Sequence, residues 1–327
     1  MKHQVGTVKA LWRYPVKSMD GEQLNIAKIE KSGLVGDRYW AIRDEEKDEL
    51  SSVRKLPALL QCSAKYLSEP QVDQVGSDIP QVTITLPDGS RFNSNDEDKN
   101  SRISDYLKKD VSLWPLQPRS NWQFYRLKTM NGEAALKKQF NVTHALPDMS
   151  SISWSKLLEL SIFSTPLGHY YDIYPLHIIS SNSIEKLKSL DDQSDFDCKR
   201  FRANMYIESM DKNAHFDEFD WVGGLLYIGD TIIKCESKTV RCSMPAQPQP
   251  GINKDTHILR TLERQTERHL GINATIIKAG TINDGDPVYW VPESKYSMSK
   301  FFRPISNKIR NALIQAMLKA TDKLGKG

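Results

Sequence analysis

The N-terminal third of the chain alternates apolar and polar residues, and its apolar positions are rich in β-branched and aromatic side chains. Such a pattern predicts short strands, because successive side chains of a strand point to opposite faces. Turns separate the segments, for example at 87–90 with Pro, Asp and Gly in a favourable order. A helix is expected at 96–110. We expect strands at residues 6–14, 23–30, 37–44, 63–67, 81–86 and 111–116.

The alternation resumes after residue 165, whereas residues 116–165 are the least regular part of the chain. Amphipathic helices are expected at 182–190 and at 257–271, the second ending at Gly271 as its C-cap. Strands outnumber helices and do not alternate regularly with them, which predicts an α+β, mainly β fold rather than a doubly wound sheet. The strands expected here cover residues 175–182, 200–209, 223–237 (a hairpin turning at Gly229), 273–279 and 286–291.

Length and charge narrow the class of protein. The 327 residues accommodate two domains, and 39% apolar with 26% charged residues is ordinary for a soluble globular protein. No apolar run is long enough to span a membrane and no signal peptide is visible, so we expect a cytoplasmic protein. Residues 295–327 hold eight Lys or Arg and one Asp, which leaves 37 basic and 40 acidic residues before them. A body with a net charge of −3 argues against a nucleic-acid partner.

The C-terminal segment predicts a basic amphipathic helix. Apolar residues recur at helical spacing, and lysines and arginines occupy the other faces. The helix can pack against the barrel of its own chain or a neighbour's, which suits its modest hydrophobicity. It can also lie on an anionic membrane surface as a peripheral contact, or form a docking surface for an acidic protein partner. The apolar stripe consists of Ile305, Ile309, Leu313, Met317 and Leu324.

The four cysteines are single residues without metal-site spacing. Cys62, Cys198, Cys235 and Cys242 form no C-x-x-C pair, which argues against a structural zinc site or an iron–sulfur cluster. Cys242 follows an expected strand and precedes a proline-rich loop, so its thiol would be held on a stiff rim. Arg241 beside it would favour the thiolate, the form that attacks or binds metals. The alternative is an inert, buried cysteine next to a surface arginine.

Basic residues at expected strand ends are candidates for binding an anion. Lys17 and Ser18 follow Pro15 at the end of the first strand, and Arg38 and Arg54 lie in later turns. Each of these could equally be a solvated side chain. No P-loop, G-x-G-x-x-G, G-x-S-x-G or H-E-x-x-H motif is present.

The segment 200–204 offers a further anion-binding candidate. Alternation on a strand would place Arg200 and Arg202 on one face, which suits a phosphate or carboxylate. The competing interpretation is an ion pair within the chain, with the acidic stretch 191–197.

Taken in order, these segments resemble the MOSC family, named for the C-terminal domain of molybdenum cofactor sulfurase. The resemblance covers residues 5 to about 291. It implies residues 1–125 as an N-terminal β-barrel-like domain, 126–165 as an irregular connector, 166–292 as the MOSC domain, and 293–327 as the tail helix. The motifs that carry it are YPVKS, GLVGDRYW, YPLHIISSNS, DFDCKRFRAN, VRCSMP and GTINDGDPVYW.

The resemblance implies a molybdenum cofactor of the molybdopterin type, with Cys242 as catalytic residue and metal ligand. A soft thiolate suits molybdenum better than an imidazole does. Pyridoxal phosphate is not expected, because no lysine motif for it is visible. The loop after Cys242 departs from the family pattern, and Val240 stands where a small polar residue is expected, so the substrate is less defined than the cofactor. The expected cofactor-binding residues are Lys17, Ser18, Arg38, Arg54, Ser180, Ser181, Ser183, Arg202, Asn204 and Arg241.

Two functions from different classes follow from the resemblance. The first is a molybdenum-cofactor oxidoreductase that reduces N-hydroxylated small molecules, similar to the amidoxime-reducing component. Its electrons would come from a separate flavoprotein or iron–sulfur protein, because the tail contains no cysteine. The second is a sulfur carrier or cofactor-handling protein in which Cys242 bears a persulfide. A binding module without activity is a third.

Overall fold

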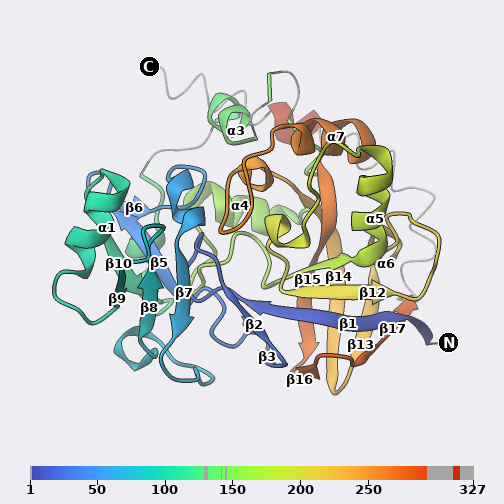
Figure 1. The fold of residues 1–327 in the computed structure, drawn as a ribbon, viewed down its shortest axis with the longest axis horizontal. Helices are drawn as coiled ribbons and strands as arrows, with labels where there is room; N and C mark the ends of the chain where they lie inside the picture. Colours follow the sequence, from blue (N-terminus) through green and yellow to red (C-terminus); the bar gives the residue numbers. More distant parts are fainter. Residues whose placement is uncertain (1, 129–131, 141, 144–145, 293–311, 317–327) are drawn as a thin grey trace.

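The computed structural model describes residues 2–128, 132–140, 142–143, 146–292 and 312–316 (Figure 1). Seven strands close into a barrel, since β1 pairs with β12 as well as with β17. All neighbours in the barrel run antiparallel except β11 and β12. The mainly β fold predicted from the sequence is confirmed. In barrel order the strands are β12 (Met205–Ser209), β11 (Leu176–Ser180), β15 (His269–Lys278), β14 (Thr231–Val240), β13 (Gly224–Ile228), β17 (Pro287–Pro292) and β1 (His3–Arg13).

The barrel core follows from the period-two pattern of its strands. In β13 and β14, buried side chains alternate with half-exposed ones, because one face of each strand points into the barrel. Ile207, Leu226, Ile233 and Ile272 are fully buried there. Burying one such side chain stabilises the fold by about 1.5–3 kcal/mol.

The chain crosses between two lobes immediately after β1. This strand ends at Arg13 inside the barrel sheet, where β2 (Glu22–Leu24) pairs with it. Next to the barrel, β3 (Ile26–Glu30) pairs with β4 (Gly33–Leu34) and β16 (Gly280–Asn283). The first strand therefore belongs to the C-terminal barrel although it opens the chain. The domain boundaries at 125, 165 and 292 stay a prediction.

The second lobe contains two small sheets around its own core. One sheet holds β10 (Val111–Pro115), β5 (Trp40–Asp44) and β6 (Glu49–Leu50); the other holds β7 (Ser63–Tyr66), β8 (Val82–Thr85) and β9 (Arg91–Asn93). Ile42, Leu59, Ile84 and Val111 are buried between them. Helix α1 (Lys99–Leu107) contributes Ile103 to this core.

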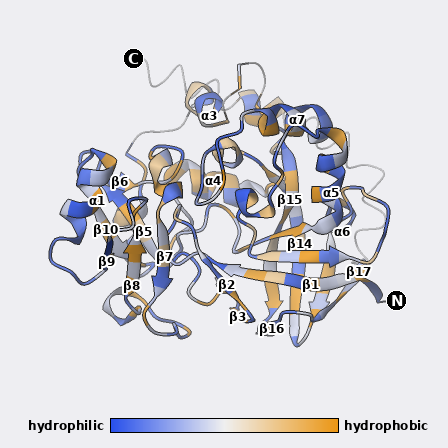
Figure 2. Ribbon diagram, viewed as in Figure 1, coloured by the Kyte–Doolittle hydropathy of each residue, from blue (hydrophilic) through white to orange (hydrophobic). Residues whose placement is uncertain are grey.

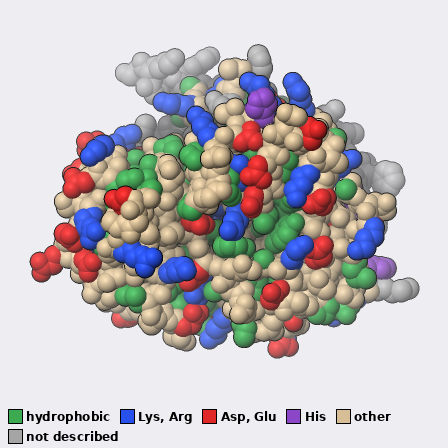
Figure 3. Space-filling model, viewed as in Figure 1, with side chains coloured by type: hydrophobic (Ala, Val, Ile, Leu, Met, Phe, Trp, Pro, Cys, Tyr) green, Lys and Arg blue, Asp and Glu red, His purple; other side chains and the backbone are tan. Residues whose placement is uncertain are grey.

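Helices cover the barrel and form the connector between the lobes. On α5 (Ser181–Leu190) and α7 (His257–Thr266), apolar residues face the barrel and hydrophilic ones face outward (Figure 2). Short helix α6 (Glu218–Trp221) lies before β13. The stretch predicted to be irregular contains α2 (Trp122–Tyr125), α3 (Glu133–Phe140) and α4 (Trp154–Ile162). Basic and acidic side chains are interspersed on the face shown in Figure 3.

Two local predictions are wrong. The helix predicted to end at Gly271 ends at Thr266, where Glu267 and Arg268 take the left-handed conformation. Gly271 lies in β15 instead, with a φ of +73°, and a Cβ there would approach His177 Nε2 to 2.4 Å. The strand predicted from residue 200 begins only at Met205, because a 3-10 helix covers Cys198–Phe201.

Most of the predicted C-terminal helix lies outside the described residues. Residues 312–316 are helical. Ile314 is 5% exposed and packs with Leu146, Met149 and Ile152, whereas Leu313 is 53% exposed. The inward position is therefore Ile314 rather than Leu313, which the predicted stripe contained. Among the described residues, no helix is long and apolar enough to cross a membrane.

Candidate functional site

The turn after β1 places a buried lysine against an exposed carboxylate. Lys17 Nζ donates to the Tyr170 carbonyl at 2.7 Å and to Asp172 Oδ1 at 2.6 Å. The Lys17 side chain is 6% exposed and that of Asp172 68%. Burial lowers the Lys17 pKa, against the opposing effect of Asp172. The surrounding protein raises the pKa of Asp172, but the charges of Lys17 and Arg54 outweigh it and keep that carboxyl ionised.

Two arginines lie over the Tyr14 ring. The guanidinium carbons of Arg202 and Arg38 are 4.1 and 5.5 Å from the ring centroid. Arg38 pairs with Asp37, which also accepts a hydrogen bond from the Tyr14 backbone N–H at 2.9 Å. Arg202 is only 5% exposed, yet its Nη1 and Nη2 have no partner among the described residues. A buried, unpaired guanidinium is costly unless an anion completes it.

Three of the predicted site residues have strained backbones. Ser18, Arg38 and Arg202 have φ values of 73°, 57° and 52°, in the left-handed region. This conformation costs a side-chain-bearing residue about 1–2 kcal/mol. Five other described residues that are not glycine share the sign, among them Asp48 and Asp73 in turns. Strained residues tend to gather at functional sites, and these three surround Lys17 and Tyr14.

Arg241 and Cys242 directly follow β14, and Arg241 interacts electrostatically with Arg202. Arg241 Nη2 donates to the Phe201 carbonyl at 2.8 Å, and Nη1 donates to His177 Nε2 at 3.3 Å. Its Nε has no partner among the described residues. Burial lowers the Arg241 pKa to about 10, against the attraction of Cys242 and Asp172. Cys242 is half-buried and carries a free thiol.

The loop after Cys242 is held by Arg200, which is fully buried. Its Nη1 donates to the carbonyls of Asn253 at 3.0 Å and Pro245 at 3.3 Å, and its Nη2 forms an ion pair with Asp195 at 3.3 Å. The ion pair within the chain is therefore the correct interpretation for Arg200. Arg202 faces Tyr14 instead, because the left-handed turn separates the two arginines.

The predicted serines form a second, closed network beside the barrel. Ser180 Oγ contacts Asp217 and lies 2.7 Å from Glu218 Oε2, and Ser183 Oγ donates to Glu218. Ser181 Oγ accepts from the Ser209 backbone N–H at 2.9 Å. These hydroxyls are buried and already bonded within the protein.

The two remaining predicted residues lie apart from each other. Asn204 accepts from the His177 backbone N–H at 3.2 Å and donates to the Trp12 carbonyl at 3.3 Å, so it links β1, β11 and the start of β12. Arg54 is exposed, and its charge acts on both Lys17 and Asp172.

The structure thus brings together a set that we call the cationic cluster, beside Cys242. Sequence reasoning missed Tyr14, Asp172 and His177, which connect its members. Tyr14 is the first residue of the YPVKS motif, so the motif could have indicated that it belongs to the site. The cationic cluster consists of Lys17, Arg38, Arg202 and Arg241.

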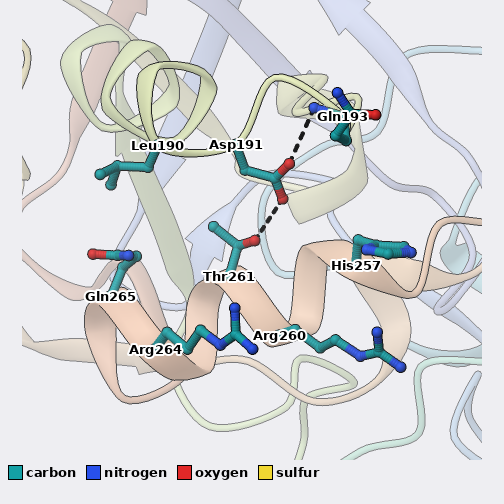
Figure 4. A pocket seen from close by; sticks show the side chains of 8 residues that line it. All are labelled: Leu190, Asp191, Gln193, His257, Arg260, Thr261, Arg264 and Gln265. Carbon is teal, nitrogen blue, oxygen red and sulfur yellow. Dashed lines mark hydrogen bonds between the residues drawn. The ribbon is translucent and has the colours of Figure 1, made fainter.

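A pocket lies elsewhere, between the end of α5 and α7 (Figure 4). Its volume is about 280 Å³, and Asp191 accepts there from Thr261 Oγ1 at 2.6 Å and from the Gln193 backbone N–H at 3.1 Å. None of the predicted site residues lines it. Its lining residues are Leu190, Asp191, Gln193, His257, Arg260, Thr261, Arg264 and Gln265.

The fold and the site define a two-lobed β protein with a cluster of largely buried basic side chains beside a free thiol. The family model described as the MOSC domain matches residues 167–289, and the MOSC N-terminal beta barrel domain matches residues 5–117. The chain therefore belongs to the MOSC family, and the resemblance seen in the motifs is confirmed.

Curated relatives extend over most of the chain. Mitochondrial amidoxime reducing component 2 of Homo sapiens is 28% identical over 311 residues, covering 88% of this chain and 84% of the relative. Mitochondrial amidoxime-reducing component 1 of Homo sapiens is 26% identical over 318 residues, covering 88% and 83%. Among solved structures, the YUAD protein from Bacillus subtilis aligns with 90% of this chain and 100% of its own, with 10% identity and a TM-score of 0.40.

Proposed function

We propose that this chain binds a molybdenum cofactor at the cationic cluster, with Cys242 as the metal ligand, and reduces N-hydroxylated small molecules. The observation that carries the proposal is the buried guanidinium of Arg202, whose two terminal nitrogens lack partners among the described residues. A phosphate would complete them with charge-assisted hydrogen bonds. The names of the curated relatives support the reductase class.

The donor set fits such a cofactor. Arg202, Lys17 and Arg38 offer positive charge within one region, where burial and like charges lower the pKa of Lys17 and Arg202. An anion would relieve that repulsion. Arg54 at the exposed rim and the backbone of Ser18 would complete the enclosure. Ser180, Ser181, Ser183 and Asn204 would act by fixing β11 and α5, since their side chains are bonded within the protein.

The chemistry divides between the cofactor and the chain. When bound, the cofactor supplies oxygen-atom transfer coupled to a change in metal oxidation state. Arg241, which directly precedes Cys242, would stabilise the negative charge of a thiolate bound to the metal. Arg200 holds the loop that follows Cys242, so that the thiol stays in place while substrate enters. We also propose a separate electron donor, of the flavoprotein or iron–sulfur type.

The half-buried thiol of Cys242 also suits the second function, a persulfide carrier. A sulfur held there would be reachable and would lie beside a positive charge. This function needs no metal, and elemental analysis distinguishes the two.

The test is to purify the full chain from a host that makes the cofactor and to measure molybdenum, pterin and labile sulfur per chain. The enzyme requires near-stoichiometric molybdenum and pterin, together with amidoxime reduction by a chemically reduced dye. Cys242→Ser should abolish this activity and leave the fold intact. Cys198→Ser is the matched control, because Cys198 is also half-buried. Labile sulfur without molybdenum would support the carrier, and full activity in Cys242→Ser would refute the mechanism.

A further inference from the structure

His177 lies in β11 between two arginines of the cationic cluster and is rigidly held. Its backbone N–H donates to Asn204 Oδ1 at 3.2 Å, and its carbonyl accepts from the Asn204 backbone N–H at 2.8 Å. The ring packs against Gly271, where a Cβ would lie 2.4 Å from Nε2. The imidazole is therefore placed by two strands and has little room to turn.

The ring nitrogen Nε2 has two competing contacts. It lies 3.3 Å from Arg241 Nη1 and 3.4 Å from the Leu270 carbonyl. A guanidinium can only donate and a carbonyl can only accept, so Nε2 can bond to one of the two but not to both. The Arg241 contact is the shorter, and we assign Nε2 as its acceptor, which places the ring proton on Nδ1. The backbone of Arg202 lies close enough to the ring to oppose the lowering of its pKa.

The surroundings also keep the ring neutral. Burial, followed by the positive charge of Arg241, lowers the pKa of His177 well below its usual range. An imidazolium would place two positive charges in contact and remove the acceptor for Arg241.

We propose that His177, protonated at Nδ1, is a positioning residue of the cofactor site, which accepts from Arg241 and holds that guanidinium beside Cys242. The same ring also lies beside the backbone of Arg202, so it borders both arginines. This inference rests on the proposed function, because it assigns the purpose of the contact. Replacing a residue that supports the groups bound to a metal typically lowers the affinity for the metal by about 10- to 100-fold.

The contact itself can be tested in the full chain with or without cofactor. Long-range ¹H–¹⁵N NMR of histidine-labelled protein at pH 7 reports the tautomer of each ring, and His177→Leu identifies the resonance. We expect a protonated Nδ1 and an unprotonated Nε2 whose shift changes in Arg241→Ala. An imidazolium or an Nε2-protonated ring at 177 would overturn the proposal.

The positioning role is tested by cofactor retention during dialysis, measured as molybdenum and pterin per chain. His177→Leu should lose cofactor about 10-fold faster than the native chain. His177→Gln should stay near the native rate, because Gln Oε1 can accept from Arg241 while its amide donates to Leu270. His177→Leu should add little in an Arg241→Ala background, since both changes remove the same contact.

A buried histidine outside the cluster provides the control. His269 contacts the carbonyls of Thr266 and Asp148, so His269→Leu should affect stability but leave cofactor retention unchanged. Native retention in His177→Leu, or full additivity with Arg241→Ala, would overturn the inference while leaving the proposed function intact. A native chain that binds no molybdenum refutes both the proposed function and the positioning role.

Discussion

Asp217 and Glu218 are buried beside the serines at the start of α5. Both carboxyl groups are ordinarily ionised at pH 7, but the hydrogen bonds here require one of them to be protonated. Ser180 Oγ accepts from the Ser183 backbone N–H at 3.2 Å and contacts both Asp217 and Glu218. One hydroxyl proton cannot serve two carboxylates, so one acid must donate. Asp217 accepts from Ser209 Oγ at 2.7 Å, whereas burial raises the pKa of Glu218 to about 7, against the effect of Ser183. The extra proton therefore belongs to Glu218.

Replacing Glu218 by Gln tests this assignment through the pH dependence of stability. The carboxyl has a pKa of about 7 in the folded chain against an ordinary value of 4.5. The contribution of Glu218 to the free energy of unfolding is fully present below pH 4.5 and is lost as the pH rises to 7. Between these values the carboxyl ionises in the unfolded state but stays protonated in the folded state. The loss amounts to about 3 kcal/mol at 1.36 kcal/mol per pH unit. Glu218→Gln stays neutral and should not show it.

Urea unfolding at pH 5 and pH 8.5 measures the difference. The stability of Glu218→Gln relative to the native chain should rise by about 2.5 kcal/mol from the lower to the higher pH, because the unfolded carboxyl is already partly ionised at pH 5. Glu185→Gln is the control, because Glu185 lies on the exposed side of the same helix and pairs with Lys188 at 3.0 Å. A change below about 1 kcal/mol in Glu218→Gln would show that Glu218 is ionised in the fold. An equal change in Glu185→Gln would show that the pH dependence does not come from Glu218.

Two further predictions concern the cluster and the tail. Arg202→Ala and Lys17→Ala should each lower molybdenum content, since each removes a charged contact of about 1.5–3 kcal/mol, and unchanged content in both would refute the placement of the phosphate. Ile314→Asp should lower the melting temperature because it puts a charge against Leu146, whereas Leu313→Asp at the exposed position should not. Equal melting temperatures for the two tail variants would show that the tail does not dock there.

Local patterns predicted most strands, because the alternation of apolar and polar residues in a strand is visible in neighbouring positions of the sequence. They could not predict that β1 closes the barrel, since its partner β12 lies about 200 residues away. The sequence does not show that the hydroxyls of Ser180 and Ser183 are already bonded, because their partners, Asp217 and Glu218, belong to a later segment.

The prediction of a strand around Arg202 failed for a different reason. Its residues favour a strand, but the side chain of Asp197 accepts from the Lys199 backbone N–H and starts a 3-10 turn. That turn leaves Arg202 in a left-handed conformation facing Tyr14. Cys242 and Lys17 were predicted as site residues because family motifs surround them, whereas His177 gave no signal beyond its place in a buried strand.

X-ray absorption at the molybdenum K-edge tests the central claim most directly. The measurement compares the native chain with Cys242→Ser, both loaded with cofactor, and counts the sulfur atoms around the metal. If Cys242 is the ligand, the variant has one sulfur fewer and the Cys198→Ser control keeps the native number. An identical sulfur shell in the native chain and Cys242→Ser would contradict the account.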